Sequence, residues 1–69
     1  MRGEPKMNNI GTNLQRLRKA KGIFQSDISA SLCISQPTYS LYENGQREPS
    51  ADMLIQIADF FGITVDELI

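Results

Sequence analysis

Signals that start and stop helices constrain the fold of this chain more than any other feature. Ser50 and Thr64 each precede a helical pattern, where a side-chain oxygen can accept a hydrogen bond from a free N–H group of the first turn. Gly22 and Gly62 follow such patterns, where glycine adopts the left-handed conformation at little cost. The signals lie close together, so the chain is predicted to be all-α, with five short helices and no strand.

Apolar residues recur at helical spacing between these signals. The predicted helices run from about residue 9 to Gly22, over 25–32, from Ser35 to about Asn44 and from Ser50 to Gly62, and a last short helix follows the capping box of Thr64 and Glu67. Their inward faces predict a core of Ile10, Leu14, Leu17, Ile28, Leu32, Tyr39, Tyr42, Met53, Leu54, Ile57, Ala58, Phe61 and Leu68.

Size and composition exclude several classes of protein. The 69 residues suffice for one domain. We expect that domain over 9–69, after a flexible arm over 1–8 that Gly3 and Pro5 interrupt. One cysteine forms no internal disulfide, and the absence of histidine excludes zinc sites of the Cys and His type. No membrane span or signal peptide is found, so a cytoplasmic protein of a bacterium or phage is expected.

An enzyme is not expected from this composition. There is no histidine to act as a general base, and Cys33 has no evident base near it in sequence. A pocket of about 300 Å³ is hard to build in so few residues. No cofactor, metal ion or small-molecule substrate is therefore predicted.

The net charge of −1 hides an uneven distribution. Residues 1–23 carry six of the seven basic residues, whereas residues 24–69 carry seven of the eight acids. DNA-binding proteins usually show a basic face. A near-neutral total is compatible with such a face, so composition alone does not decide whether the chain binds nucleic acid.

The interval from Gln25 to Gly45 contains two short helices separated by a turn of three or four residues, which matches a helix-turn-helix unit. From Ile10 to Ile69 the sequence resembles the lambda-repressor/Cro-like family, also called the xenobiotic-response-element type. The resemblance rests on the joint order of LRKAKG, a glutamine at the head of the second helix, SQPTYSLYENG, EPS and FFGITVDEL. It implies a DNA-binding transcriptional regulator that places its third helix in the major groove.

A helical wheel places Tyr39 and Tyr42 on the inward side of the third helix. The family's geometry then implies that the outward side meets base edges. Gln36 fits the N6/N7 edge of adenine, and Pro37 and Leu41 can touch thymine methyl groups, so a half-site rich in A·T pairs is predicted. With the residues expected near phosphate, the DNA-binding candidates are Gln25, Gln36, Pro37, Thr38, Ser40, Leu41, Asn44 and Arg47.

The resemblance also assigns roles to residues outside the outward face. Gln25 stands where the family has a glutamine that bonds phosphate and braces the first reading side chain. Arg18 and Glu43 occupy positions that the family joins in a structural salt bridge. Arg47, in the loop after the third helix, is the foremost candidate for a direct phosphate contact.

Three positions depart from the family's pattern. Cys33 lies in a turn where glycine is usual, and we expect a small buried side chain there rather than a redox switch. Phe24 replaces the usual N-cap threonine or serine, and it either packs beside Ile23 or faces DNA or a partner. Pro37 leaves two alternatives for the N-cap of the third helix, Ser35 or Gln36.

The implied partner is double-stranded operator DNA, bound by a homodimer. In the family, C-terminal surfaces such as that of Phe60, Ile63 and Ile69 join two subunits on a palindrome, although the same residues could simply end the core. A repressor that occupies its operator is the first hypothesis. The second is an antitoxin-like or adaptor module with a protein partner such as a toxin, which the acidic C-terminal two-thirds favours.

Overall fold

The computed structural model describes residues 9–69, and the predicted arm over 1–8 lies outside these residues. Five helices form this part of the chain, and it contains no strand. The all-α prediction is confirmed. The helices are α1 (Ile10–Lys21), α2 (Gln25–Ser31), α3 (Gln36–Glu43), α4 (Ala51–Phe61) and α5 (Val65–Leu68).

The predicted caps hold the helix ends. The Ser50 hydroxyl accepts a hydrogen bond from the backbone N–H of Met53 at 3.1 Å, and the Thr64 hydroxyl accepts one from that of Glu67 at 3.1 Å. The Glu67 carboxylate in turn accepts from the backbone N–H of Thr64 at 3.0 Å, which completes a capping box. Gly22 and Gly62 end α1 and α4 with φ of 70°. These local signals therefore set the helix lengths.

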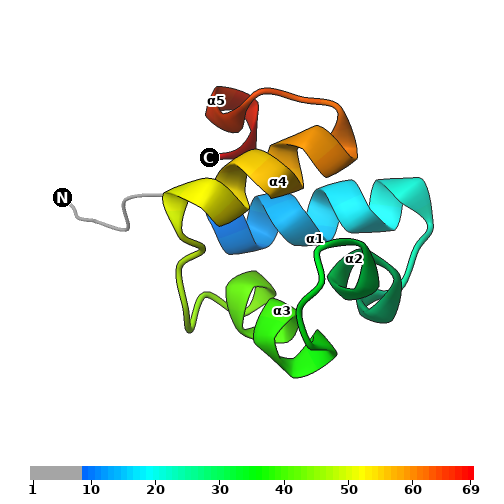
Figure 1. Ribbon diagram of the computed structural model, residues 1–69. Coiled ribbons are helices and arrows are strands. Elements are labelled where there is room, and N and C mark those ends of the chain that lie inside the picture. Colours follow the sequence, from blue (N-terminus) through cyan, green and yellow to red (C-terminus); the bar gives the residue numbers. More distant parts are fainter. Residues whose placement is uncertain (1–8) are drawn as a thin grey trace, which may run out of the picture.

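α1 connects the two halves of the fold, because it contacts both α3 and α5 (Figure 1). The α2–α3 pair lies on one side of it, and the α4–α5 pair covers the other. Asn13 of α1 donates from Nδ2 to the backbone oxygen of Leu68 at 2.7 Å, which ties the last helix to the first. The predicted core residues that are buried here are Ile10, Leu14, Ile28, Leu32, Tyr39, Tyr42, Ile57, Ala58 and Leu68.

The remaining predicted core residues, Leu17, Met53, Leu54 and Phe61, are partly buried and pack against the same cluster. Tyr39 and Tyr42 meet edge to face, with their ring centroids 6.4 Å apart. The inward direction predicted for α3 is therefore right, and the opposite side of α3 is left to face outward.

Candidate nucleic-acid interface

The turn from Leu32 to Ser35 joins α2 to α3 and sets the angle between them. Cys33 in this turn has φ of 60°, the left-handed conformation that the family's glycine would adopt easily. Its side chain is exposed, so the prediction of a buried cysteine is wrong. The core is filled from both sides of this turn by Leu32 and Ile34, and Cys33 between them lies on the solvent side, as loop residues commonly do.

Ser35 is the N-cap of α3, and the alternative of a Gln36 cap is wrong. Ser35 has an extended backbone (φ −73°, ψ 153°), and its hydroxyl accepts from the Thr38 N–H at 3.2 Å. Gln36 is then the first helical residue and Pro37 the second, where the missing proline N–H leaves no helical hydrogen bond broken. Gln36 consequently stands at the tip of the helix with its side chain exposed.

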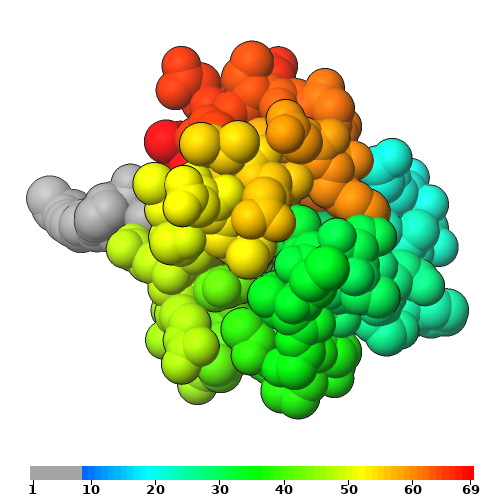
Figure 2. Space-filling model, in the orientation of Figure 1, coloured from blue at the N-terminus to red at the C-terminus, as the bar shows by residue number. Residues whose placement is uncertain are grey.

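The other candidates on α3 differ in accessibility. Pro37 and Asn44 are exposed, whereas Thr38, Ser40 and Leu41 are half-buried. The Thr38 hydroxyl accepts from that of Ser35 at 2.8 Å and so forms part of the cap. In the space-filling view, α3 and the loop that follows it form one continuous face at the lower end of the molecule (Figure 2).

A chain of hydrogen bonds connects the tip of α3 to the protein interior. Gln36 donates from Nε2 to Oε1 of Gln25 at 2.5 Å. Gln25, the first residue of α2, donates from its own Nε2 to Oε1 of Glu43 at 2.9 Å. The structure thus brings together Gln25 and Gln36, as the family resemblance implies. The further link to Glu43 was not predicted, because it depends on how α2 packs across the end of α3.

Glu43 also forms an ion pair with Arg18 of α1. Arg18 donates from Nε to Oε2 of Glu43 at 2.6 Å and from Nη2 to Oε1 at 3.2 Å. The Glu43 side chain is only 1% exposed, and that of Arg18 is 14% exposed. A third donor of Arg18, Nη1, reaches the backbone oxygen of Ile23 at 3.0 Å, which fixes the guanidinium in place.

Burial and hydrogen bonding act against each other on the Glu43 carboxyl. Burial alone would raise its pKa, but the hydrogen bonds from Arg18 and Gln25 outweigh this and hold the pKa below its usual value. The same ion pair raises the pKa of Arg18. Burial also raises the pKa of the neighbouring Tyr39 phenol. Glu43 is therefore an anion in the folded protein, and it is compensated by a cation.

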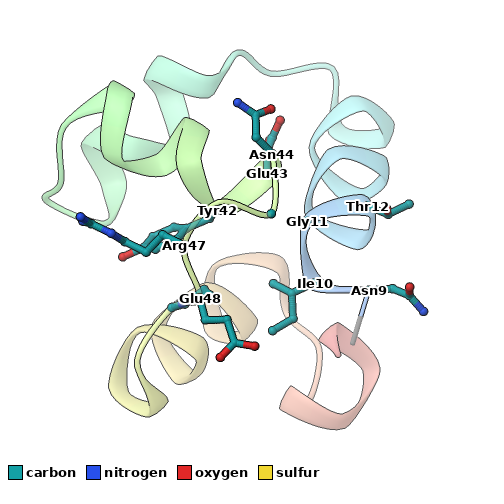
Figure 3. A pocket seen from close by; sticks show the side chains of 11 residues that line it. Asn9, Ile10, Gly11, Thr12, Tyr42, Glu43, Asn44, Arg47 and Glu48 are labelled. Atoms are coloured by element: carbon teal, nitrogen blue, oxygen red, sulfur yellow. The ribbon is translucent and has the colours of Figure 1, made fainter. Parts of the chain in front are cut away.

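Arg47 and Asn44 lie at the other end of α3, beside a groove of about 330 Å³. The groove lies between the start of α1 and the loop before α4, and in Figure 3 the exposed Arg47 side chain extends away from α1. A hollow of this size was not expected in so short a chain. Among residues 9–69 no cluster of potential metal ligands is found.

Large apolar side chains are exposed at three places. Phe24 is 75% exposed, so it does not pack beside Ile23, and it borders a shallow hollow with Arg18, Gln25, Ser26 and Gln36. Ile69 is 48% exposed and Ile55 is 52% exposed. The exposure of Ile55 was not predicted. The sequence does indicate it, because the four apolar residues in the run from Met53 to Ile57 cannot all face one side of a helix.

None of the helices over residues 9–69 is both long enough and apolar enough to cross a bilayer.

Comparisons with known proteins agree with this geometry. The helix-turn-helix family profile matches residues 14–68. An uncharacterized transcriptional regulator of Bacillus subtilis is 37% identical over 83% of this chain and 49% of its own. A transcriptional repressor of a cryptic phage in Vibrio cholerae is 36% identical over 86% of this chain and 53% of its own. This chain thus spans about half the length of both relatives.

A solved structure shares the fold as well. The crystal structure of a transcriptional regulator from Listeria innocua superposes with a TM-score of 0.83 at 32% identity, over 87% of this chain and 56% of that one. These relatives bear the names of regulators and not of enzymes, in agreement with the expectation of a non-enzymatic protein. The chain therefore belongs to the lambda-repressor/Cro-like helix-turn-helix family.

Proposed function

We propose that the chain is a sequence-specific DNA-binding regulator that inserts the start of α3 into the major groove. The observation that carries this proposal is the position of Gln36, which is exposed at the tip of α3 and held there by Gln25. A braced side chain at a helix tip is suited to base reading, because its conformational freedom is already lost before DNA binds.

Base readout combines Gln36 with neighbouring apolar contacts. The Gln36 amide can donate and accept at once and so matches the N7 and N6 groups of adenine. Pro37 is exposed beside it, and Leu41 is half-exposed one turn further along, so both are available to thymine methyl groups. Ser40 serves either base. This combination favours a half-site rich in A·T pairs, and a selected half-site of G·C pairs alone would contradict it.

Phosphate contacts are expected to be few. Arg47 is the only basic residue in 24–69, and it is exposed in the loop after α3. Asn44 is exposed close by, and Gln25 keeps one N–H hydrogen after donating to Glu43. The affinity should therefore fall only shallowly with salt, as for about 2–5 phosphate contacts per subunit.

A homodimer on a palindromic operator is the arrangement we favour. Ile69 leaves an apolar side chain exposed at the C-terminal end, and Phe60 and Ile63 are partly buried there. On a palindromic operator, two copies paired in this way would have to hold their reading helices about 34 Å apart, which is one turn of DNA. Light scattering that gives a monomer mass both free and on DNA would contradict this arrangement.

The name of the phage relative supports repression by occupancy of an operator. A reporter placed behind the selected operator tests the sign of regulation. Expression of the protein should lower the reporter signal, and deletion of the operator should restore it. A rise in the signal would make the protein an activator.

A protein partner such as a toxin is the second candidate. It is favoured by the 75% exposure of Phe24 and by the absence of any basic residue within α2 and α3. The two functions are separated by titration with DNA fragments at several salt concentrations. Specific binding whose log K falls with log salt supports the DNA function, whereas no binding to any selected sequence at low salt contradicts it.

A variant at the tip of α3 makes the test residue-specific. Gln36→Ala should relax the choice of base at one position of the half-site by about 1–3 kcal/mol. Gln46→Ala is the matched control, because Gln46 is an exposed glutamine in the loop after α3. Its base preference should equal that of the unchanged protein.

A further inference from the structure

The Gln36–Gln25–Glu43 chain has a chemical direction. An ionised carboxylate can only accept hydrogen bonds, whereas a glutamine amide has donors at Nε2 and an acceptor at Oε1. Gln25 must therefore turn its Nε2 towards Glu43, which the 2.9 Å contact shows. Its Oε1 is then left facing Gln36, and Gln36 must present an N–H to it, as the 2.5 Å contact shows.

This direction decides what Gln36 still offers to a ligand. One of its two N–H hydrogens is used on Gln25, so one N–H and Oε1 remain. A donor next to an acceptor matches adenine, which shows an acceptor at N7 and a donor at N6 in the major groove. Guanine shows acceptors at both N7 and O6, so it matches two donors instead.

We propose that Glu43 is a positioning residue for DNA recognition, because its carboxylate fixes through Gln25 the direction of the Gln36 amide and thereby the preference for adenine over guanine. This inference rests on the proposed function, since it presupposes that Gln36 reads a base.

The surroundings of Glu43 suit it to this task. Arg18 binds both carboxylate oxygens, at 2.6 and 3.2 Å, so the carboxylate cannot rotate freely. The Glu43 side chain is 1% exposed, which keeps water from replacing Gln25 as the donor to its carboxylate. The Gln25 side chain hydrogen-bonds to Glu43 and to Gln36, and of these two partners the Glu43 carboxylate can only accept, whereas the Gln36 amide can either donate or accept. The orientation of both amides is therefore set by Glu43, at the buried end of this series of hydrogen bonds, and passed through Gln25 to Gln36.

The substitution Glu43→Gln tests the direction itself. The shorter Arg18 contact, from Nε to Oε2 at 2.6 Å, holds the new amide oxygen at the Oε2 position, so the amide N–H group takes the Oε1 position that faces Gln25. Gln25 must then turn its oxygen inward and its N–H group towards Gln36. Gln36 would accept from Gln25 with its oxygen and present two donors outward, which suits guanine.

The experiment measures the affinity of the folded protein for operator fragments that differ only in adenine or guanine at the position that Gln36 reads. For Glu43→Gln we expect the adenine-to-guanine preference to fall by about tenfold or more, with guanine gaining in absolute affinity. If Glu43 had only a structural role, Glu43→Gln would weaken binding to both fragments alike. The ratio of the two affinities would then stay unchanged.

A second variant keeps the test decisive if Glu43→Gln does not fold. Gln25→Leu leaves the Arg18–Glu43 pair intact but removes the hydrogen bonds that link Glu43 to Gln36. The preference for adenine over guanine should therefore shrink towards equality without a shift to guanine. Gln15→Leu is the matched control, because the Gln15 amide donates to the backbone oxygen of Glu43 at 3.4 Å and not to its carboxylate. It should retain the full preference.

The outcomes separate this inference from the proposed function. If the unchanged protein binds no DNA sequence specifically, the proposed function fails. If it binds specifically and both Glu43→Gln and Gln25→Leu keep its adenine preference, the function stands and the role of Glu43 is refuted.

Discussion

Gly11 of α1 lies directly against the backbone of Glu43 at the end of α3. A Cβ atom built on Gly11 would stand 2.6 Å from the carbonyl oxygen of Glu43 and 2.9 Å from that of Tyr42. Both oxygens belong to the main chain, so neither can swing aside as a side chain would. This close approach presses the end of α3 against α1, next to the Arg18–Glu43 ion pair that joins the same helices.

Gly11→Ala should therefore destabilise the fold, although alanine is the better helix former. The gain in helix propensity is at most about 1 kcal/mol, the value for a helix interior, because Gly11 lies in the first turn of α1. Forcing two helices apart in a packed interior costs about 1–3 kcal/mol, and more where only backbone can yield. We expect a net loss in the free energy of unfolding, measured by urea denaturation. Thr12→Ala, at an exposed position of the same helix, is the control and should lose nothing.

Relief of backbone strain at Cys33 should stabilise the protein. A residue with a Cβ atom pays about 1–2 kcal/mol for the left-handed conformation, and Cys33 has φ of 60°. Glycine removes this strain, but it also gives the unfolded chain more conformational entropy, which lowers the free energy of unfolding by up to about 1 kcal/mol. Cys33→Gly should raise the melting temperature slightly, and Cys33→Ser should leave it unchanged. Equal melting temperatures for all three proteins would show that the turn is unstrained.

Phe24→Ser should stabilise α2 by supplying the missing N-cap. No side-chain bond caps this helix, although the Asp27 carboxylate accepts from the Phe24 N–H at 2.8 Å and forms half of a capping box. A serine hydroxyl would add the other half, worth about 1 kcal/mol. The ring is 75% exposed, so its removal uncovers little apolar area. Phe24→Ala removes the ring without adding a cap, and in chemical denaturation it should not show the gain.

The helices were predictable because their signals are local. Ser50, Thr64, Gly22 and Gly62 act within one turn of their own positions, and each was found at the expected helix end. The inward direction of Tyr39 and Tyr42 follows from helical spacing in the same way. DNA contacts of the eight candidate residues remain predictions.

What the sequence did not reveal depends on packing between helices. The bond from Gln25 to Glu43 exists only because α2 crosses the end of α3. Gly11 is a glycine in the first turn of α1, which hints at a close contact but not at its partner. Cys33 was expected inside because cysteine is commonly buried. Its exposure follows from the path of the turn, which no local pattern encodes.

Acid should remove the contribution of Glu43 to stability. Its pKa in the folded protein is held below the ordinary value of 4.5, so the unfolded chain binds the proton more readily. The contribution is complete above that ordinary value and is lost as the pH falls through the lower pKa of the folded state. Urea denaturation over a range of pH should show that Glu43→Gln differs most from the unchanged protein near neutrality. The difference should shrink on acidification; a constant difference would contradict the assignment.

Arg47→Ala should weaken binding to every DNA sequence by the same factor. Arg47 is exposed in the loop between α3 and Pro49, from which it can reach a phosphate. A phosphate contact does not distinguish one base from another. Loss of one phosphate contact should lower the slope of log K against log salt by about one. Lys21→Ala is the matched control, because it removes an equal charge from outside the loop after α3. The Nζ of Lys21 lies 5.9 Å from the centroid of the Phe60 ring of α4. If Lys21→Ala reduced the salt slope as much as Arg47→Ala, the loss would reflect net charge alone, and the loop after α3 would not be a phosphate contact.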